Sequence, residues 1–245
     1  MRHVIIVVSL VLALVQPDAA VRSSYVGGTL MAAFVTRTSI LLCSDGRVVN
    51  STDGAIVRDD WSKVHRLASQ TGMLTGGRDI PGLLQGISGA LSRTPGAAAP
   101  EIADLTQEVL ERTWGQLSTN NRPPDGRALA LVVGFDDRGL VRAFELDSDD
   151  RPSFRVEEIG LFNGGSDLEV IAIATGSGPN LDVSRTIIGH LDTIYRRQPS
   201  IDRQRLFMAA FNVAKDELAT RNSRIGGRTF AAEIDRAGGF RDVSW

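Results

Sequence analysis

The chain has 245 residues, of which 42% are apolar, and its 27 basic and 29 acidic residues leave a net charge of −2. This length is enough to bury one sizeable core. The near-zero charge argues against nucleic acid as a partner, because such partners need a basic surface. The single cysteine, Cys43, excludes an internal disulfide framework and a cysteine-rich metal site.

The first 28 residues differ in composition from the remainder. A short basic start precedes a twelve-residue hydrophobic run, Val4 to Val15. This run is too short to span a bilayer comfortably, but it suits the core of a signal peptide. We therefore expect residues 1–28 to be a signal-like leader and propeptide of a secreted or periplasmic protein, and residues 29–245 to be the folded domain. The alternatives are an uncleaved anchor, or a propeptide on a cytoplasmic protein.

The first part of the domain has strand patterns. Apolar or alternating runs separated by turn residues predict strands over residues 29–37, 39–45, 63–69 and 71–77, with a short pair on either side of the Asp53-Gly54 turn. Residues 80–91 and 102–117 then carry apolar side chains at helical spacing, joined by a loop over 92–100. A second loop, 119–127, closes this helix pair.

The second part repeats this order. Strands are predicted over residues 128–136, 140–148, 153–162 and 168–178, helices around 187–194 and 207–218, and a closing strand over 228–235. Helices that come in pairs argue against single helices alternating with parallel strands. The fold class expected is therefore α+β, a four-layer α-β-β-α sandwich of two antiparallel sheets.

Gly27-Gly28-Thr29 stands at the start of the first strand. A threonine hydroxyl is a poor nucleophile until a base takes its proton. A free α-amine on the same residue can do this, because its pKa of about 7.7–8.0 lies near neutrality. Cleavage directly before Thr29 would free that amine, and the preceding glycine eases the strained turn that self-cleavage demands.

Five motifs in order resemble proteasome β-type subunits and their bacterial homologues, within the N-terminal nucleophile hydrolases. Gly28-Thr29 resembles their processing site, and Asp45 with Arg47 in "SDGR" resembles their acid-x-arginine motif. "SKVHRL" matches their lysine strand at Lys63, "MLTGGRD" matches their oxyanion segment at Gly76, and "ATGSG" matches their Gly-Ser-Gly at Ser177. The resemblance covers nearly the whole chain after Gly28.

The resemblance implies a role for each matched residue. Thr29 would be the nucleophile, Lys63 would lower the pKa of the Thr29 hydroxyl and relay its proton, and Asp45 would hold Lys63, with Arg47 in support. Ser177 would steady the Thr29 amine. The backbone N–H of Gly76 would stabilise the oxyanion. Near the last strand, Asn222 stands where the family has the acid that steadies the nucleophile's amine, and its amide can still hydrogen-bond there but carries no charge. Ile225 replaces the serine usual in the family, and the two changes weaken the case for full activity.

The resemblance also implies a threonine peptidase that processes itself at Gly28-Thr29. It would cleave peptides or unfolded proteins inside a homo-oligomeric ring. No metal or other cofactor is expected, since no metal-ligand spacing accompanies His65 or His190. Two alternatives stay open: a catalytically weak or inactive structural ring subunit, and a small-molecule amidase of the same superfamily.

Overall fold

The computed structural model describes residues 25–26, 29–50, 53–77, 80, 82–118, 128–148, 154–163, 166–175 and 183–243. Within these residues there are thirteen strands and four helices. Residues 1–24, which hold the predicted signal-like run, and Ser177 lie outside the described residues.

One five-stranded antiparallel sheet carries the start of the folded domain. Its order is β11-β2-β3-β12-β13, formed by Leu168–Ala174, Leu30–Thr36, Ser39–Asp45, Thr229–Asp235 and Gly239–Val243. Strand β2 is buried throughout. It is apolar along its whole length because both of its faces are covered, so it lacks the alternation of a half-exposed strand.

The second five-stranded antiparallel sheet has the order β10-β9-β8-β7-β6. Its strands are Phe154–Glu158, Val141–Ser148, Ala128–Phe135, Thr71–Gly77 and Val64–Ala68. Strands β7 and β8 pair over their full length, from Thr71 opposite Gly134 to Gly77 opposite Ala128.

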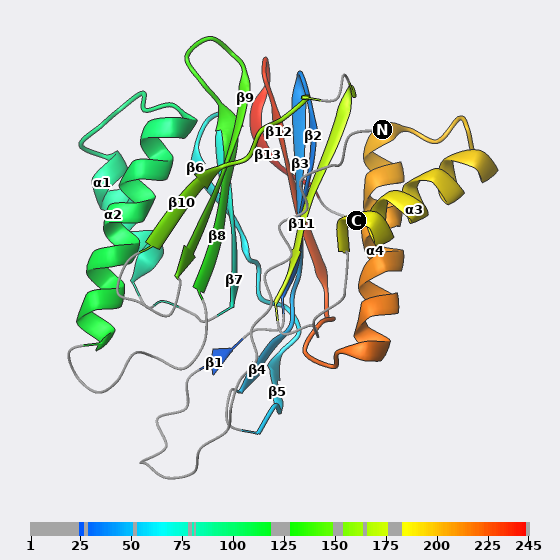
Figure 1. Cartoon of the computed structure of the whole chain (residues 1–245), viewed down its shortest axis with the longest axis horizontal. Helices are drawn as coiled ribbons and strands as arrows, with labels where there is room; N and C mark the ends of the chain where they lie inside the picture. Colours follow the sequence, from blue (N-terminus) through cyan, green and yellow to red (C-terminus); the bar gives the residue numbers. More distant parts are fainter. Residues whose placement is uncertain are drawn as a thin grey trace.

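Helices pack in pairs, and each pair contacts a different sheet (Figure 1). Helices α1 (Leu83–Leu91) and α2 (Ala99–Ser118) contact the sheet that contains β8 and β9. Helices α3 (Val183–Arg197) and α4 (Arg203–Arg221) contact the sheet that contains β2, β3 and β11. Three hydrophobic clusters result: one under each helix pair, and one between the sheets.

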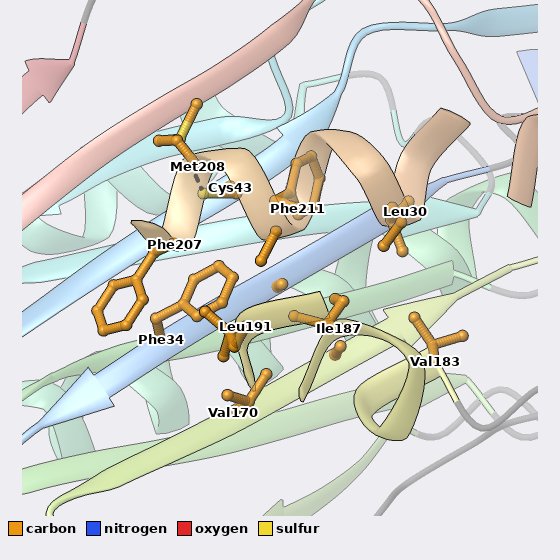
Figure 2. Packing of buried hydrophobic residues seen from close by; sticks show 14 of the residues in the cluster. Leu30, Phe34, Cys43, Val170, Val183, Ile187, Leu191, Phe207, Met208 and Phe211 are labelled. Atoms are coloured by element: carbon orange, nitrogen blue, oxygen red, sulfur yellow. Dashed lines mark hydrogen bonds between the residues drawn. The ribbon is translucent and has the colours of Figure 1, made fainter. Parts of the chain in front are cut away.

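The period of two along β2 divides its side chains between two of these clusters. Leu30, Ala32 and Phe34 belong to the cluster under α3 and α4. Met31, Ala33 and Val35 belong to the cluster between the sheets. Figure 2 shows the first of these clusters, where the Phe34 ring stacks on Phe207 of α4 with 4.8 Å between centroids.

The expected fold class is wrong. A four-layer sandwich of two antiparallel sheets was expected, whereas the described strands form three antiparallel sheets and the chain is richer in strands than expected. The third sheet joins β1 (Tyr25–Val26), β4 (Val48–Asn50) and β5 (Ile56–Arg58) in the order β1-β4-β5. Strands β4 and β5 are the short pair expected on either side of the Asp53-Gly54 turn. Their pairing with β1 was not expected, because β1 lies within the predicted leader.

Candidate active site

A pocket of about 320 Å³ opens between the start of β2 and the end of β7. Thr29, Lys63 and Gly76, three of the residues matched in the sequence, line it together. The rest of the lining is largely apolar, and includes Val48, Ile80, Leu83, Leu84, Leu110 and Leu129. A concave apolar pocket with a few converging polar groups is the usual form of a binding or catalytic site.

Thr29 stands directly before β2 and is fully buried. Its nitrogen donates a hydrogen bond to Oγ1 of Thr175 at 3.0 Å. Its carbonyl oxygen accepts one from the nitrogen of Thr175 at 2.9 Å. Among the described residues, the Thr29 hydroxyl has no hydrogen-bond partner. Because a buried polar group without a partner costs free energy, such a group is a candidate for a reacting atom.

Lys63 and Asp45 form a buried ion pair, with 2.7 Å between Nζ and Oδ1. The lysine side chain is 6% exposed and the carboxylate is fully buried. Lys63 Nζ also donates to the carbonyl oxygen of Arg47 at 2.9 Å. The backbone nitrogens of Leu30 and Gly226 each donate to the Asp45 carboxylate at 3.0 Å. The carboxylate therefore ties the strand that begins after Thr29 to the lysine.

Burial shifts the pKa of both members of this pair toward their neutral forms. It lowers the pKa of Lys63, and the Asp45 carboxylate opposes that shift. Burial likewise raises the pKa of Asp45, against the opposing effects of Lys63 and of the N–H donors of Gly226 and Leu30. A lysine with a lowered pKa gives up its proton more readily than an exposed one, which is what a proton relay needs.

Gly76 lies in β7 directly beside Thr29. A Cβ atom at this position would stand 3.3 Å from Cε of Met31 and 3.4 Å from Cγ2 of Thr29. The missing side chain therefore lets the β7 main chain approach the threonine closely.

Arg47 reaches the site through a loop. Its guanidinium binds the Asp59 carboxylate with two bonds, of 2.7 and 3.2 Å. It also donates to the carbonyl oxygens of Ser223 at 2.8 Å and Ile225 at 3.3 Å. The loop that contains these carbonyls also presents the Gly226 nitrogen to Asp45. Arg47 thus positions the loop.

Asn222 ends helix α4, and its Oδ1 accepts a hydrogen bond from the nitrogen of Arg224 at 3.0 Å. Its Nδ2 is buried, with no partner among the residues described. No hydrogen bond between Asn222 and Thr29 occurs within the described part of the chain. The expected role of Asn222 in steadying the nucleophile is therefore not seen as a direct contact.

Two further residues of the pocket were not among the site residues predicted from the sequence. The Nε2 atom of His65 lies 3.0 Å from Oγ1 of Thr75, and His65 lines the pocket. Trp61 also lines the pocket and is 43% exposed.

Thr175 was missed. It follows β11, two residues before Ser177, in the segment that was matched for its serine. The only sequence signal is a hydroxyl at the end of an apolar strand.

No protein-family model matches the chain, and no curated protein matches it. Within the described residues, no helix combines the length and apolar character needed to cross a membrane. The same residues contain no cluster of three or more His, Cys, Asp or Glu placed to hold a metal ion.

Proposed function

We propose that this chain is a threonine-type peptidase of the N-terminal nucleophile kind, similar to a proteasome β-type subunit. The observation that carries the proposal is that Thr29, Lys63 and Gly76 line one pocket, with Asp45 bonded to Lys63 at 2.7 Å. All four residues lie on separate strands or directly beside them, so their convergence is independent of the sequence motifs. The resemblance of those motifs is a second, separate support.

In the proposed reaction, cleavage of the Gly28–Thr29 bond frees the Thr29 amine. Thr29 Oγ1 then bonds to the carbonyl carbon of a bound peptide, while its proton passes to the Thr29 amine, assisted by Lys63. The peptide C–N bond breaks, the leaving amine takes that proton, and an ester remains. Water hydrolyses the ester and restores the hydroxyl.

The test uses the full-length protein and its Thr29→Ala variant. Intact-mass measurement is expected to find the native chain beginning at Thr29 and the variant uncleaved at that bond. With a panel of fluorogenic peptides, the variant is expected to lose at least about 1,000-fold in kcat/KM, as nucleophile removal commonly does. The matched control is Thr193→Ala on the exposed face of α3, which should keep both processing and hydrolysis.

A structural ring subunit is the second candidate, and the Asn222 amide favours it. The acid usual in the family is replaced there by a neutral group whose Nδ2 has no partner among the described residues. An intact Gly28–Thr29 bond together with no hydrolysis of any peptide would select this candidate. Hydrolysis of simple amides but not of peptides would instead select the small-molecule amidase.

The assembly and compartment follow from the same proposal. We expect a homo-oligomeric ring that encloses the Thr29 sites, which light scattering on the purified protein would detect. The hydrophobic run from Val4 to Val15 supports export to the periplasm or outside the cell, with a cytoplasmic location as the alternative. Cell fractionation combined with N-terminal sequencing of the mature protein distinguishes these locations.

A further inference from the structure

Thr175 holds the main chain of Thr29 from both sides. Its Oγ1 accepts the hydrogen bond of the Thr29 nitrogen at 3.0 Å. Its own nitrogen donates to the Thr29 carbonyl at 2.9 Å. The two residues are 146 positions apart in the sequence, so the contact depends on the fold.

This reciprocal contact extends the ladder between β11 and β2. Ala174 stands opposite Leu30 at the last register position, so the residues that follow and precede them, Thr175 and Thr29, meet next. Ala174 and Leu30 are buried, at 5% and 0% exposure. Buried ladder positions move little, and Thr175 is therefore held at a fixed distance from the nucleophile's nitrogen.

We propose that Thr175 is a positioning residue for the nucleophile: its hydroxyl holds the Thr29 nitrogen after cleavage, as it does before. The inference rests on the proposed function, because the nitrogen has a chemical role only if Thr29 becomes the first residue. The main chain then loses the peptide bond that had fixed the nitrogen. Among the described residues, the hydrogen bond that then restrains that nitrogen is the one to Thr175 Oγ1.

A hydroxyl suits this position for two reasons. It accepts one N–H of the amine, and the amine's remaining hydrogens or lone pair are then directed away from Thr175. The branched threonine side chain also has few rotamers, so its oxygen stays in place. Among the described residues, Lys63 lines the pocket with Thr29 and Asp45 binds the neighbouring Leu30 nitrogen, and the two charged groups are bonded to each other and to the main chain.

The plain structural alternative is that the Thr175 hydroxyl only satisfies a buried peptide N–H. In that case its loss lowers the free energy of unfolding and leaves turnover per processed chain unchanged. A positioning role instead lowers kcat with little change in KM, because the amine acts in the chemical step.

The experiment compares Thr175→Val, Thr175→Ser and the control Thr106→Val in the full-length chain. Thr106 is a fully buried threonine whose hydroxyl donates to the main chain within α2. Its valine variant therefore matches the loss of a buried hydroxyl at a position outside the site. Peptide hydrolysis is measured for each variant and divided by the fraction of chains that begin at Thr29, as determined by intact mass.

The expected result for T175V is a fall in kcat of about 10- to 100-fold with KM within about twofold, as misplacement of a reacting group produces. T175S should restore kcat to within a few-fold of the native value, and T106V should keep it. If the valine variant does not fold, T175A replaces it, with the same expectations.

Unchanged kcat in T175V, alongside an inactive T29A, would overturn the positioning role and leave the peptidase proposal standing. A native chain that is neither cleaved before Thr29 nor active on any peptide overturns both. A fall in kcat that T175S does not restore also overturns the role of the hydroxyl.

Discussion

The Lys63–Asp45 ion pair is buried, and hydrogen bonds from the main chain offset the free-energy cost of removing its two charges from water. Two charges buried without further bonds destabilise a fold. Here two backbone N–H groups reach the carboxylate, and a backbone carbonyl reaches the lysine. Each partner comes from a different segment, so the pair also links β3, the chain before β6 and the loop after α4.

At this scale the sequence predicts some residues and misses others for a physical reason. Asp45 and Lys63 were identified because each belongs to a short local motif. Thr175 and Asp59 were missed because their importance depends on their partners, Thr29 and Arg47, which the fold brings beside them. A hydroxyl or a carboxylate in isolation does not reveal its partner.

His65 makes stability depend on pH. Burial lowers its pKa to about 4, against 6.5 for an ordinary histidine. The unfolded chain therefore binds a proton between pH 6.5 and 4 that the folded chain does not. The contribution of His65 to the free energy of unfolding is therefore fully present above about pH 6.5. It is lost as the pH falls toward 4, which lowers the free energy of unfolding by up to about 3 kcal/mol.

Urea denaturation at several pH values measures this effect. The variant His65→Gln, which keeps a polar group beside Thr75 but does not titrate, should lose less stability than the native protein between pH 6.5 and 4. Thr106→Val is the control and should keep the native slope, because it removes a buried hydroxyl but no titrating group and retains His65. Equal slopes in native protein and H65Q would contradict the assignment.

At the scale of elements, the periodic patterns located the long helices and strands, and boundaries were the main error. Helix α2 begins at Ala99, inside the predicted loop 92–100. Pro100 is tolerated because the N–H groups of a helix's first turn have no acceptor within the helix, so the N–H that proline lacks is not needed there. The Glu101 carboxylate accepts a hydrogen bond from the Ala98 nitrogen just before the helix. Strand β13 was missed because it is an edge strand, with no buried side chain.

The loop between α4 and β12 is held by the side chain of Arg47. Arg47 binds the Ser223 and Ile225 carbonyls and the Asp59 carboxylate through different parts of its planar group. Arg47→Lys keeps the charge but cannot make this set of bonds. We expect the Gly226 amide, which donates to Asp45, to exchange its hydrogen about 10-fold faster in R47K, as weaker local closure allows.

Hydrogen exchange followed by mass spectrometry or NMR tests this expectation. The control is Arg58→Lys, because Arg58, on the exposed strand β5, pairs with Asp60 and not, among the described residues, with the loop. R58K should leave exchange at Gly226 unchanged. Native exchange at Gly226 in R47K would show that the loop is held without the guanidinium.

Across the whole molecule, the two five-stranded sheets supply side chains to three buried clusters, one on the outer face of each sheet and one between the sheets. The cluster between the sheets draws residues from both of them, for example Leu42 from β3 and Leu131 from β8. Each sheet therefore relies on the other to cover its inner face. The paired helices in the sequence indicated a cluster under each pair. Of the third sheet, the β4–β5 pair was predicted at the Asp53-Gly54 turn, but the addition of β1 was not, because β1 lies in the segment set aside as leader.

This sharing predicts that the molecule unfolds as one unit. Phe207→Ala opens the cluster under α3 and α4, where Phe207 stacks on Phe34, and should cost about 3–5 kcal/mol. Ile87→Ala opens the cluster under α1 and α2, where Ile87 is fully buried, and should cost about 2–5 kcal/mol. Val213→Ala on α4 is the control and should cost less than about 0.5 kcal/mol, because Val213 is 44% exposed.

Far-ultraviolet circular dichroism and tryptophan fluorescence should follow one coincident denaturation curve in each variant, shifted to lower denaturant for F207A and I87A. The reason is that disrupting either outer cluster unfolds the sheet beneath it. The inner face of the other sheet is then exposed to water, so the cluster between the sheets is lost in the same step. Two separate transitions in F207A, with the sheet under α1 and α2 unfolding only at higher denaturant, would mean that each helix-covered sheet is stable alone. The central cluster would then join two folding units.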